Sequence, residues 1–255
     1  MNNITAIIQA RLGSSRLPGK TLMVIEGETL LGHLVRRITP SKYLTDIIIA
    51  TTTEKRDDAI VSFAEQRGLK FFRGSEHDVL DRFYQTAVAF HLETIVRVTP
   101  DCPLMDYRVI DLVIKEYIRG PYDYVSNILP PTYPDGLDTE VFSFSALEQA
   151  WNNAALKSER EHVTPYIRNH PERFRIGNVR CTENLSALRW TVDTTRDLEF
   201  VQAIYAHFQS RPFGMDEILE LLRKRPELKA VNVGIERNDG YQKSLREDAS
   251  IKEPE

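Results

Sequence analysis

Short apolar runs alternate with helix-like patterns along the first half of this chain, and this alternation constrains the fold more than any other feature. The apolar runs are typical of buried strands and lie at Ile4–Gln9, Asp46–Thr51, Lys70–Arg73, Thr94–Thr99 and Tyr122–Ser126. Apolar residues at helical spacing follow from Leu30, around Ile60–Ala64, from Val79 and from Val109. Because strand and helix alternate, the pattern predicts an α/β fold with a mostly parallel sheet covered on both faces.

The alternation of strand and helix patterns is interrupted after residue 128 by several prolines and a glycine. Beyond them we expect extended segments at Thr139–Phe142, Phe174–Val179 and Leu188–Val192, and helices at Ser145–Asn153, Ser158–Asn169 and Thr195–Phe208. The last segment, residues 236–255, is charged and poor in apolar residues, which is typical of a mobile tail. We therefore expect one domain over residues 1–235, with an insertion at about 128–187, followed by a flexible charged tail.

The segment after the first strand turns into a loop that contains glycine and serine. It carries Arg11, Arg16 and Lys20, and it has no acidic residue. Backbone N–H groups in such a turn form an anion-binding nest, and three nearby cations favour a polyphosphate. In open α/β sheets, ligands bind where loops leave the carboxyl ends of the strands. The loop therefore predicts the binding of nucleotide phosphates.

Two other interpretations of this loop fit the sequence less well. One is a P-loop, but five residues separate Gly13 from Gly19 where the P-loop pattern has four. Helical spacing also begins at Leu30, whereas a P-loop helix begins at the lysine, which here is Lys20. The other interpretation is a basic surface loop without a ligand, which the position directly after the first strand disfavours.

Two aspartates, Asp101 and Asp193, each follow a strand pattern. Parallel strands bring their carboxyl ends to one edge of a sheet, so the two carboxylates can meet there. Mg²⁺ is usually held by one or two carboxylates together with phosphates and waters, which suits this pair. Simpler roles stay open: Asp101 can form the turn before Pro103, and Asp193 can cap the next helix, although Thr194 competes for that place.

Composition excludes several classes of protein. The chain has 255 residues, with 33 Lys and Arg against 37 Asp and Glu, and its formal net charge is −4. A net acidic chain is not typical of nucleic-acid binding, so we expect no nucleic-acid partner. Two cysteines fit a reducing compartment, and we find neither a secretory signal nor ~18 consecutive apolar residues. We therefore expect a cytoplasmic protein that does not bind membranes.

Four segments together resemble the cytidylyltransferases that activate acidic sugars. They are Gln9–Lys20, Arg73–Phe83, Pro100–Leu104 and Val192–Leu198. The resemblance extends from Ile4 to about Phe208, and it covers the 3-deoxy-manno-octulosonate and acylneuraminate cytidylyltransferases. The subgroup it matches best is the spore coat polysaccharide biosynthesis protein F type. It implies a three-layer α/β sandwich of the nucleotide-diphospho-sugar transferase type.

The resemblance also assigns roles to residues. Asp101 and Asp193 match the family's two Mg²⁺ ligands, and Arg11 and Lys20 are expected to join them in catalysis. The expected nucleotide contacts are Ala10, Arg11, Leu12, Gly13, Ser14, Ser15, Arg16, Lys20, Arg73, Ser75 and Asp101. The expected contacts of the sugar acceptor are Asn127, Asp138, Glu140, Arg160 and His162. The insertion at about 128–187 would form the acceptor side and carry a homodimer contact.

These observations predict a Mg²⁺-dependent cytidylyltransferase that transfers CMP from CTP to an acidic sugar in surface polysaccharide biosynthesis and releases pyrophosphate. A nucleotidylyltransferase that uses another nucleotide or a sugar-1-phosphate acceptor is an alternative. A nucleotide-binding partner protein without turnover is a third reading, which the second carboxylate, Asp193, disfavours. No residue stands out in the sequence as a general base.

Overall fold

A seven-stranded sheet forms the centre of the computed structural model, which describes residues 3–14, 16–209 and 211–251. Its strands in chain order are β1 (Ile4–Gln9), β4 (Asp46–Thr52), β5 (Lys70–Gly74), β6 (Thr94–Val98), β7 (Tyr124–Ser126), β8 (Glu140–Ser143) and β9 (Ile176–Asn178). The strands β2 (Val24–Ile25) and β3 (Glu28–Thr29) pair with each other in a small separate hairpin.

The order of strands across the sheet is β5-β4-β1-β6-β8-β7-β9. The first four pair in parallel, as the alternation of strand and helix predicts. The exception is β8, which runs antiparallel to both of its neighbours, β6 and β7. Arg97 near the end of β6 therefore pairs with Glu140 at the start of β8. This reversal brings the start of β8 to the edge where β1 and β6 end.

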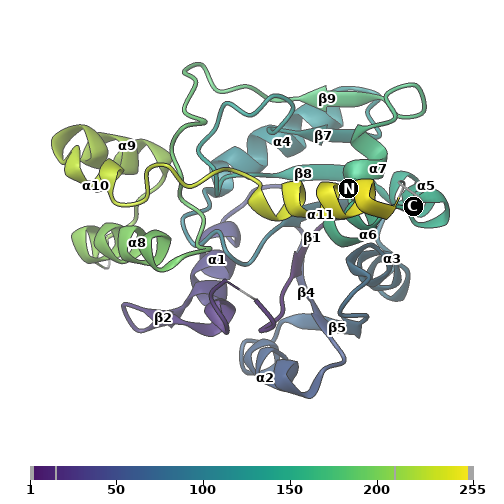
Figure 1. Ribbon diagram of the computed structural model, residues 1–255, viewed down its shortest axis with the longest axis horizontal. Helices are drawn as coiled ribbons and strands as arrows, with labels where there is room; N and C mark the ends of the chain where they lie inside the picture. Colours follow the sequence, from purple (N-terminus) through teal and green to yellow (C-terminus); the bar gives the residue numbers. More distant parts are fainter. Residues whose placement is uncertain (1–2, 15, 210, 252–255) are drawn as a thin grey trace.

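Helices cover both faces of the sheet and make three layers (Figure 1). One face carries α1 (Leu30–Ile38), α2 (Asp58–Gln66), α4 (Tyr107–Arg119), α8 (Thr195–Phe208), α9 (Met215–Lys224) and α10 (Glu227–Ala230). The other face carries α3 (Val79–Ala89), α5 (Phe144–Asn153) and α7 (Pro165–Arg168). The remaining helices are α6 (Lys157–His162), α11 (Asp239–Ile251) and the 3-10 turns η1 (Lys20–Leu22) and η2 (Lys55–Asp57). The predicted three-layer α/β class is thus confirmed.

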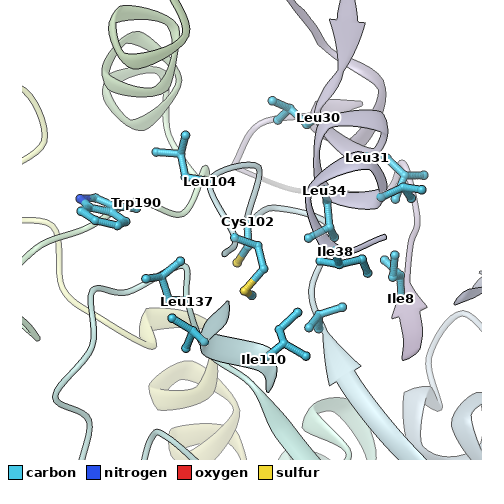
Figure 2. Packing of buried hydrophobic residues seen from close by; sticks show 14 of the residues in the cluster. Ile8, Leu30, Leu31, Leu34, Ile38, Cys102, Leu104, Ile110, Leu137 and Trp190 are labelled. Carbon is cyan, nitrogen blue, oxygen red and sulfur yellow. The ribbon is translucent and has the colours of Figure 1, made fainter. Parts of the chain in front are cut away.

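Strand periodicity divides the core into two clusters. In β1, Ala6 and Ile8 pack on the α1 face, and Ile7 packs on the α3 face, because successive side chains of a strand point to opposite sides. Cys102 lies in the cluster on the α1 face, near Leu137 and the residues of α1 (Figure 2). The loop that follows β6 is therefore anchored in the core directly beside the predicted site.

One expected strand is absent from the described part of the chain. The segment Leu188–Val192 pairs with the loop before β8 through a single bridge between Asp135 and Arg189. The N–H of Asp135 donates to Leu188 O at 2.9 Å, and the N–H of Trp190 donates to Asp135 O at 2.6 Å. The apolar pattern reflects burial of an extended segment, because Trp190 and Val192 are fully buried without a sheet partner on either side.

The helix expected at Ser158–Asn169 is divided into α6 and α7. Val163 has a φ of 71°, which a helix cannot accommodate, and the second helix starts at Pro165. Proline is favoured in the first turn of a helix, where it needs no N–H partner. The apolar spacing alone did not reveal this break.

The segment that we expected to be a mobile tail contains the helix α11. This helix packs along α6 and crosses the front of the molecule in Figure 1. The N–H of Ser158 is 3.3 Å from Asp248 Oδ1, and Lys157 forms an ion pair with Glu247. The structure corrects the prediction of a tail over Asp239–Ile251, where the partners of the charged residues lie about 90 residues earlier in the chain. Residues 252–255 lie outside the described residues.

Residues of the expected insertion are part of the main sheet, since β8 and β9 pair with β6 and β7. They continue the same core, and the domain boundaries proposed from the sequence stay a prediction. Within the described ranges, no helix combines the length and apolar character needed to cross a membrane.

Candidate active site

A cavity of about 530 Å³ opens at the edge of the sheet where β1 and β6 end and β8 begins. Its walls come from the loops after β1 and β6, the start of β8, and the helices α6 and α11. The predicted site residues that line it are Gly13, Ser14, Arg11, Arg16, Lys20, Asp101, Asp138, Glu140, His162 and Asp193. Ser15 lies outside the described residues. The structure thus brings most of the predicted site to one cavity.

The Lys20 ammonium stands between the two predicted metal ligands. Its Nζ donates to Asp101 Oδ2 at 2.8 Å, to Asp193 Oδ1 at 2.7 Å and to Val192 O at 2.8 Å. Burial disfavours the charged ammonium, but the two carboxylates outweigh it and raise the pKa of Lys20. Burial also opposes ionisation of Asp101, yet Lys20 outweighs it and lowers the pKa of Asp101 to about 2. Two distant loops therefore converge on one cation.

The donor set at this point fits magnesium. The oxygens around Lys20 Nζ come from Asp101, Asp193 and the carbonyl of Val192, and Mg²⁺ prefers oxygen ligands. Among the described residues, no group of three or more His, Cys, Asp or Glu side chains forms a complete metal cage. A site with two carboxylates is what Mg²⁺ needs when a triphosphate and waters supply the other ligands. The metal role of both aspartates stays a prediction.

Arg189 holds Asp193 from the side away from Lys20. Its guanidinium donates to Asp193 Oδ2 at 2.9 Å, to Asp135 Oδ2 at 2.7 Å and to Asp197 Oδ1 at 2.9 Å. Burial opposes its charge, but hydrogen bonds and the three carboxylates raise the pKa of Arg189. Sequence reasoning missed this residue, although an arginine inside the apolar run 188–192 was a visible signal for a buried ion pair.

Thr194 is the N-cap of α8, which leaves the Asp193 side chain for the cavity. The Thr194 hydroxyl accepts from the Asp197 N–H at 3.3 Å, and the Asp197 carboxylate accepts from the Thr194 N–H at 2.9 Å. This reciprocal capping box is the arrangement expected from the sequence. Asp193 instead pairs with Lys20 and Arg189, and also with Arg16 at 2.9 Å.

The loop after β1 presents its cations to the cavity and uses much of its backbone internally. Arg16 bridges Asp193 at 2.9 Å and Asp239 of α11 at 3.1 Å. Arg11 donates to Glu76 O at 3.2 Å and lies 3.9 Å from the Glu161 carboxylate. Both side chains line the cavity and lie beside carboxylates.

Two of the expected nucleotide contacts, Ala10 and Leu12, have backbone N–H groups that are already bonded. The N–H of Ala10 donates to Ala50 O at 3.0 Å as a continuation of the sheet. The N–H of Leu12 donates to Asp57 Oδ1 at 2.8 Å. Neither N–H is therefore available to a nucleotide base without a rearrangement of the loop.

Arg73 and Ser75 do not line the cavity. Arg73 donates to Thr52 O at 2.8 Å and to Glu54 O at 3.1 Å, and pairs with Asp58. The Ser75 hydroxyl accepts from the N–H of Asp78 at 3.0 Å. Arg73 thus holds the segment between β4 and α2, and Ser75 holds the turn between β5 and α3. The geometry gives no support to their predicted contact with the nucleotide.

Arg160 and Asn127 also have structural partners. Arg160 pairs with the Asp78 carboxylate and donates to Trp151 O at 2.8 Å, which ties α6 to α3 and α5. Asn127 is fully buried and bridges the backbone of Leu137 and Thr139. Neither lines the cavity, and a direct contact with an acceptor would need both to give up these bonds.

Three expected acceptor contacts do line the cavity. Buried Glu140 accepts from Arg97, the Tyr124 hydroxyl and the Thr164 hydroxyl; burial raises its pKa, but these partners outweigh burial and lower it. Burial lowers the pKa of His162 to about 4, and its Nε2 lies 3.0 Å from Ser244 Oγ of α11. The third, Asp138, pairs with Arg237.

Comparison with known proteins identifies the family. A family model described as cytidylyltransferase matches residues 5–242. The chain belongs to the cytidylyltransferase family. It is 41% identical to an uncharacterized protein of Methanocaldococcus jannaschii, over 96% of this chain and 98% of that protein. It is 35% identical to the spore coat polysaccharide biosynthesis protein SpsF of Bacillus subtilis, over 89% of this chain and 97% of that protein.

A solved structure supports the same conclusion. The structure of a cytidylyltransferase from Leptospira borgpetersenii matches with a TM-score of 0.87 at 32% identity, and covers 93% of this chain and 100% of that one. The resemblance seen in the four motifs is thus confirmed, and so is the expected fold type. This cytidylyltransferase is accordingly a nucleotidyltransferase enzyme.

Besides Arg189, sequence reasoning also missed Arg82 and Arg168, two further arginines that line the cavity. Arg82 is buried, its Nη1 donates to Ser75 O at 2.5 Å, and its Nε has no partner among the described residues. Burial and the nearby Arg11 lower the pKa of Arg82 to about 10. Arg168 packs over the Tyr241 ring at 4.7 Å. Neither has a carboxylate within 4.0 Å in the described part of the chain. Burial opposes the charge of Arg168, but the more distant Glu140 outweighs it and raises the pKa of Arg168.

Proposed function

We propose that this cytidylyltransferase transfers CMP from CTP to a hydroxyl of an acidic sugar in surface polysaccharide biosynthesis, with Mg²⁺ held by Asp101 and Asp193. The observation that carries the proposal is the meeting of these two carboxylates at one ammonium, Lys20, beside a basic loop. The printed name of the Bacillus subtilis relative supports the polysaccharide context.

The cations around the carboxylates are proposed to bind the triphosphate. Lys20 and Arg16 now pair with Asp193, and Arg11 lies near Glu76 and Glu161. When CTP binds, these groups exchange carboxylate partners for phosphate oxygens and hold the leaving pyrophosphate in line. Bound Mg²⁺ would supply charge neutralisation at the transferred phosphoryl group. Asp101 and Asp193, freed from Lys20, would provide its protein ligands.

The acceptor is proposed to bind between β8, α6 and α11. Arg168 lines this part of the cavity and has no carboxylate partner among the described residues, so it suits the acid group of a sugar. It takes the role that the sequence suggested for Arg160, which pairs with Asp78. Asp138, Glu140 and His162 lie nearby to orient hydroxyl groups.

A nucleotidylyltransferase with a sugar-1-phosphate acceptor is the second candidate. Arg168 favours it as well, because a guanidinium binds phosphate as readily as carboxylate. Formation of a homodimer stays a prediction.

Pyrophosphate release separates the candidates. The enzyme is incubated with Mg²⁺, each of the four nucleoside triphosphates, and a panel of acidic sugars and sugar-1-phosphates. We expect release with CTP and an acidic sugar, and its loss when Mg²⁺ is chelated. CTP should also raise the melting temperature more than ATP or GTP at equal concentration, because a ligand of the native state stabilises it. Turnover confined to a purine nucleotide, or to sugar-1-phosphates, would favour the second candidate.

A further inference from the structure

Asp138, expected from the sequence to contact the acceptor, is a carboxylate of the cavity. Its Oδ1 accepts from the Arg237 guanidinium, and no described residue donates to its Oδ2. The side chain is 28% exposed, so it is in contact with the cavity and partly shielded from water. It lies just before β8, at the edge where β1 and β6 end. One oxygen therefore remains free to face a ligand.

The backbone around Asp138 is held on both sides by one buried side chain. Asn127 donates from Nδ2 to Leu137 O at 2.8 Å and accepts at Oδ1 from the Thr139 N–H at 2.9 Å. The side chains of Leu137 and Thr139 are fully buried, whereas Asp138 between them turns to the cavity. Asn127, predicted as an acceptor contact, acts here as a positioning residue.

The same loop is fixed against the segment that carries Asp193. Gly136 has a φ of 110°, and a Cβ there would lie 2.7 Å from the Thr191 backbone nitrogen. Only glycine fits this close approach. The bridge between Asp135 and Arg189 ties the loop to that segment a second time. Asp138 is therefore held in the same cavity as the two carboxylates that are proposed to bind the metal.

The side chains of the other carboxylates of this edge are less exposed than that of Asp138 and are held by cations. Asp101 and Asp193 both accept from Lys20, and Asp135 accepts from Arg189 at 2.7 Å. Glu140 accepts from three donors, and they lower its pKa. Asp135 and Asp138 each have a single side-chain donor, but the side chain of Asp138 is 28% exposed against 11% for Asp135.

We propose that Asp138 is the general base of the reaction, a role that rests on the proposed function. The acceptor hydroxyl oxygen forms a bond to the α-phosphorus of CTP, and the bond from that phosphorus to the bridging oxygen of the β-phosphate breaks. Pyrophosphate leaves with the electron pair of that bond. The hydroxyl proton passes to Asp138 Oδ2 and from there to solvent, so no further reactant is needed.

The charges around Asp138 suit this role. Burial raises the pKa of Asp138 to about 7, against the opposing effect of Arg237. The carboxylates of Asp135 and Glu140 raise it further, and Arg97 lowers it. A base whose pKa lies near neutral pH is ionised enough to accept a proton and basic enough to hold it.

The test compares Asp138→Asn with Glu247→Gln, a control carboxylate of the cavity rim that pairs with Lys157. Both variants are assayed by pyrophosphate release with Mg²⁺, CTP and the acceptor that the wild type uses. We expect kcat of Asp138→Asn to fall by about 100- to 10,000-fold, with CTP affinity and acceptor KM nearly unchanged. In the pH profile of the wild type, kcat should decrease below pH ~7. This acid limb of the profile should be absent from Asp138→Asn. Glu247→Gln should keep both the rate and the limb.

A second variant tests the role without changing Asp138 itself. Arg237→Gln removes the group that lowers the pKa of Asp138, so the acid limb should move up by about one pH unit. An unchanged limb in Arg237→Gln, or a kcat of Asp138→Asn within threefold of the wild type, would overturn the assignment of the base alone. Wild-type enzyme that releases no pyrophosphate with any acceptor would overturn the proposed function and the base with it.

Discussion

The two halves of the cavity differ in how their charges are satisfied. On the nucleotide side, Lys20, Arg16 and Arg189 are all paired with carboxylates. On the acceptor side, Arg168 has no carboxylate partner in the described residues, and Asp138 keeps one oxygen free. On the proposed function, CTP would exchange the internal ion pairs of the nucleotide side for its phosphates. The groups left open on the acceptor side would then select the sugar.

The largest effect is expected on the nucleotide side. Asp101→Asn or Asp193→Asn keeps the shape of the side chain but removes the charge that Mg²⁺ needs. Turnover should fall by several orders of magnitude, because metal stabilisation of the transition state is worth several kcal/mol. Pyrophosphate release measures it, and binding of CTP without metal should stay the same or improve. A variant that keeps wild-type turnover would remove that aspartate from the metal site.

The next effect separates two arginines that the sequence grouped together. Arg11→Ala should weaken CTP binding by about 10- to 150-fold, since a charge-assisted phosphate contact is worth roughly 1.5–3 kcal/mol. Arg73→Ala is the matched control, because Arg73 bonds backbone carbonyls outside the cavity and should leave CTP affinity unchanged. Calorimetry with Mg²⁺ measures both. Equal losses in the two variants would mean that the nucleotide reaches the β5–α3 turn.

A smaller effect is expected on the acceptor side. Arg168→Gln should raise the acceptor KM about tenfold, the value of one charge-assisted hydrogen bond, and leave the KM for CTP unchanged. Steady-state kinetics with each substrate varied in turn distinguishes the two constants. A change confined to CTP would place Arg168 on the nucleotide side and erase the contrast between the two halves.

The smallest effect concerns stability in acid. Lys20 lowers the pKa of Asp101 to about 2 in the folded protein, from an ordinary value of 3.8. The stabilisation is therefore fully present above pH ~4 and is lost as the pH falls through 2. Asp101→Asn should flatten the fall in the free energy of unfolding between pH 4 and pH 2, measured by urea denaturation. An equally steep fall in the variant would show that other groups dominate acid unfolding.

The sequence by itself determined the parts of this protein that depend on local pattern. Alternating apolar runs predicted the parallel strands, because a buried strand must be apolar wherever it lies. The basic loop, Asp101 and Asp193 were found because each follows a strand, and parallel strand ends meet at one edge. Thr194 was visible as a candidate N-cap because a cap depends on residues close in sequence: its partner, Asp197, is three residues away.

Only the tertiary structure decided the acceptor side. The reversal of β8 brings Asp138 to the edge of the sheet that carries the cavity. No local pattern shows the direction in which a strand will pair. The helix α11 packs on α6, and the residues in contact lie about 90 positions apart in the sequence. Arg82 and Arg168 became candidates because they lack carboxylate partners among the described residues, a property of the surroundings. Burial and long-range pairing depend on the whole fold, so they appear only when the chain is assembled.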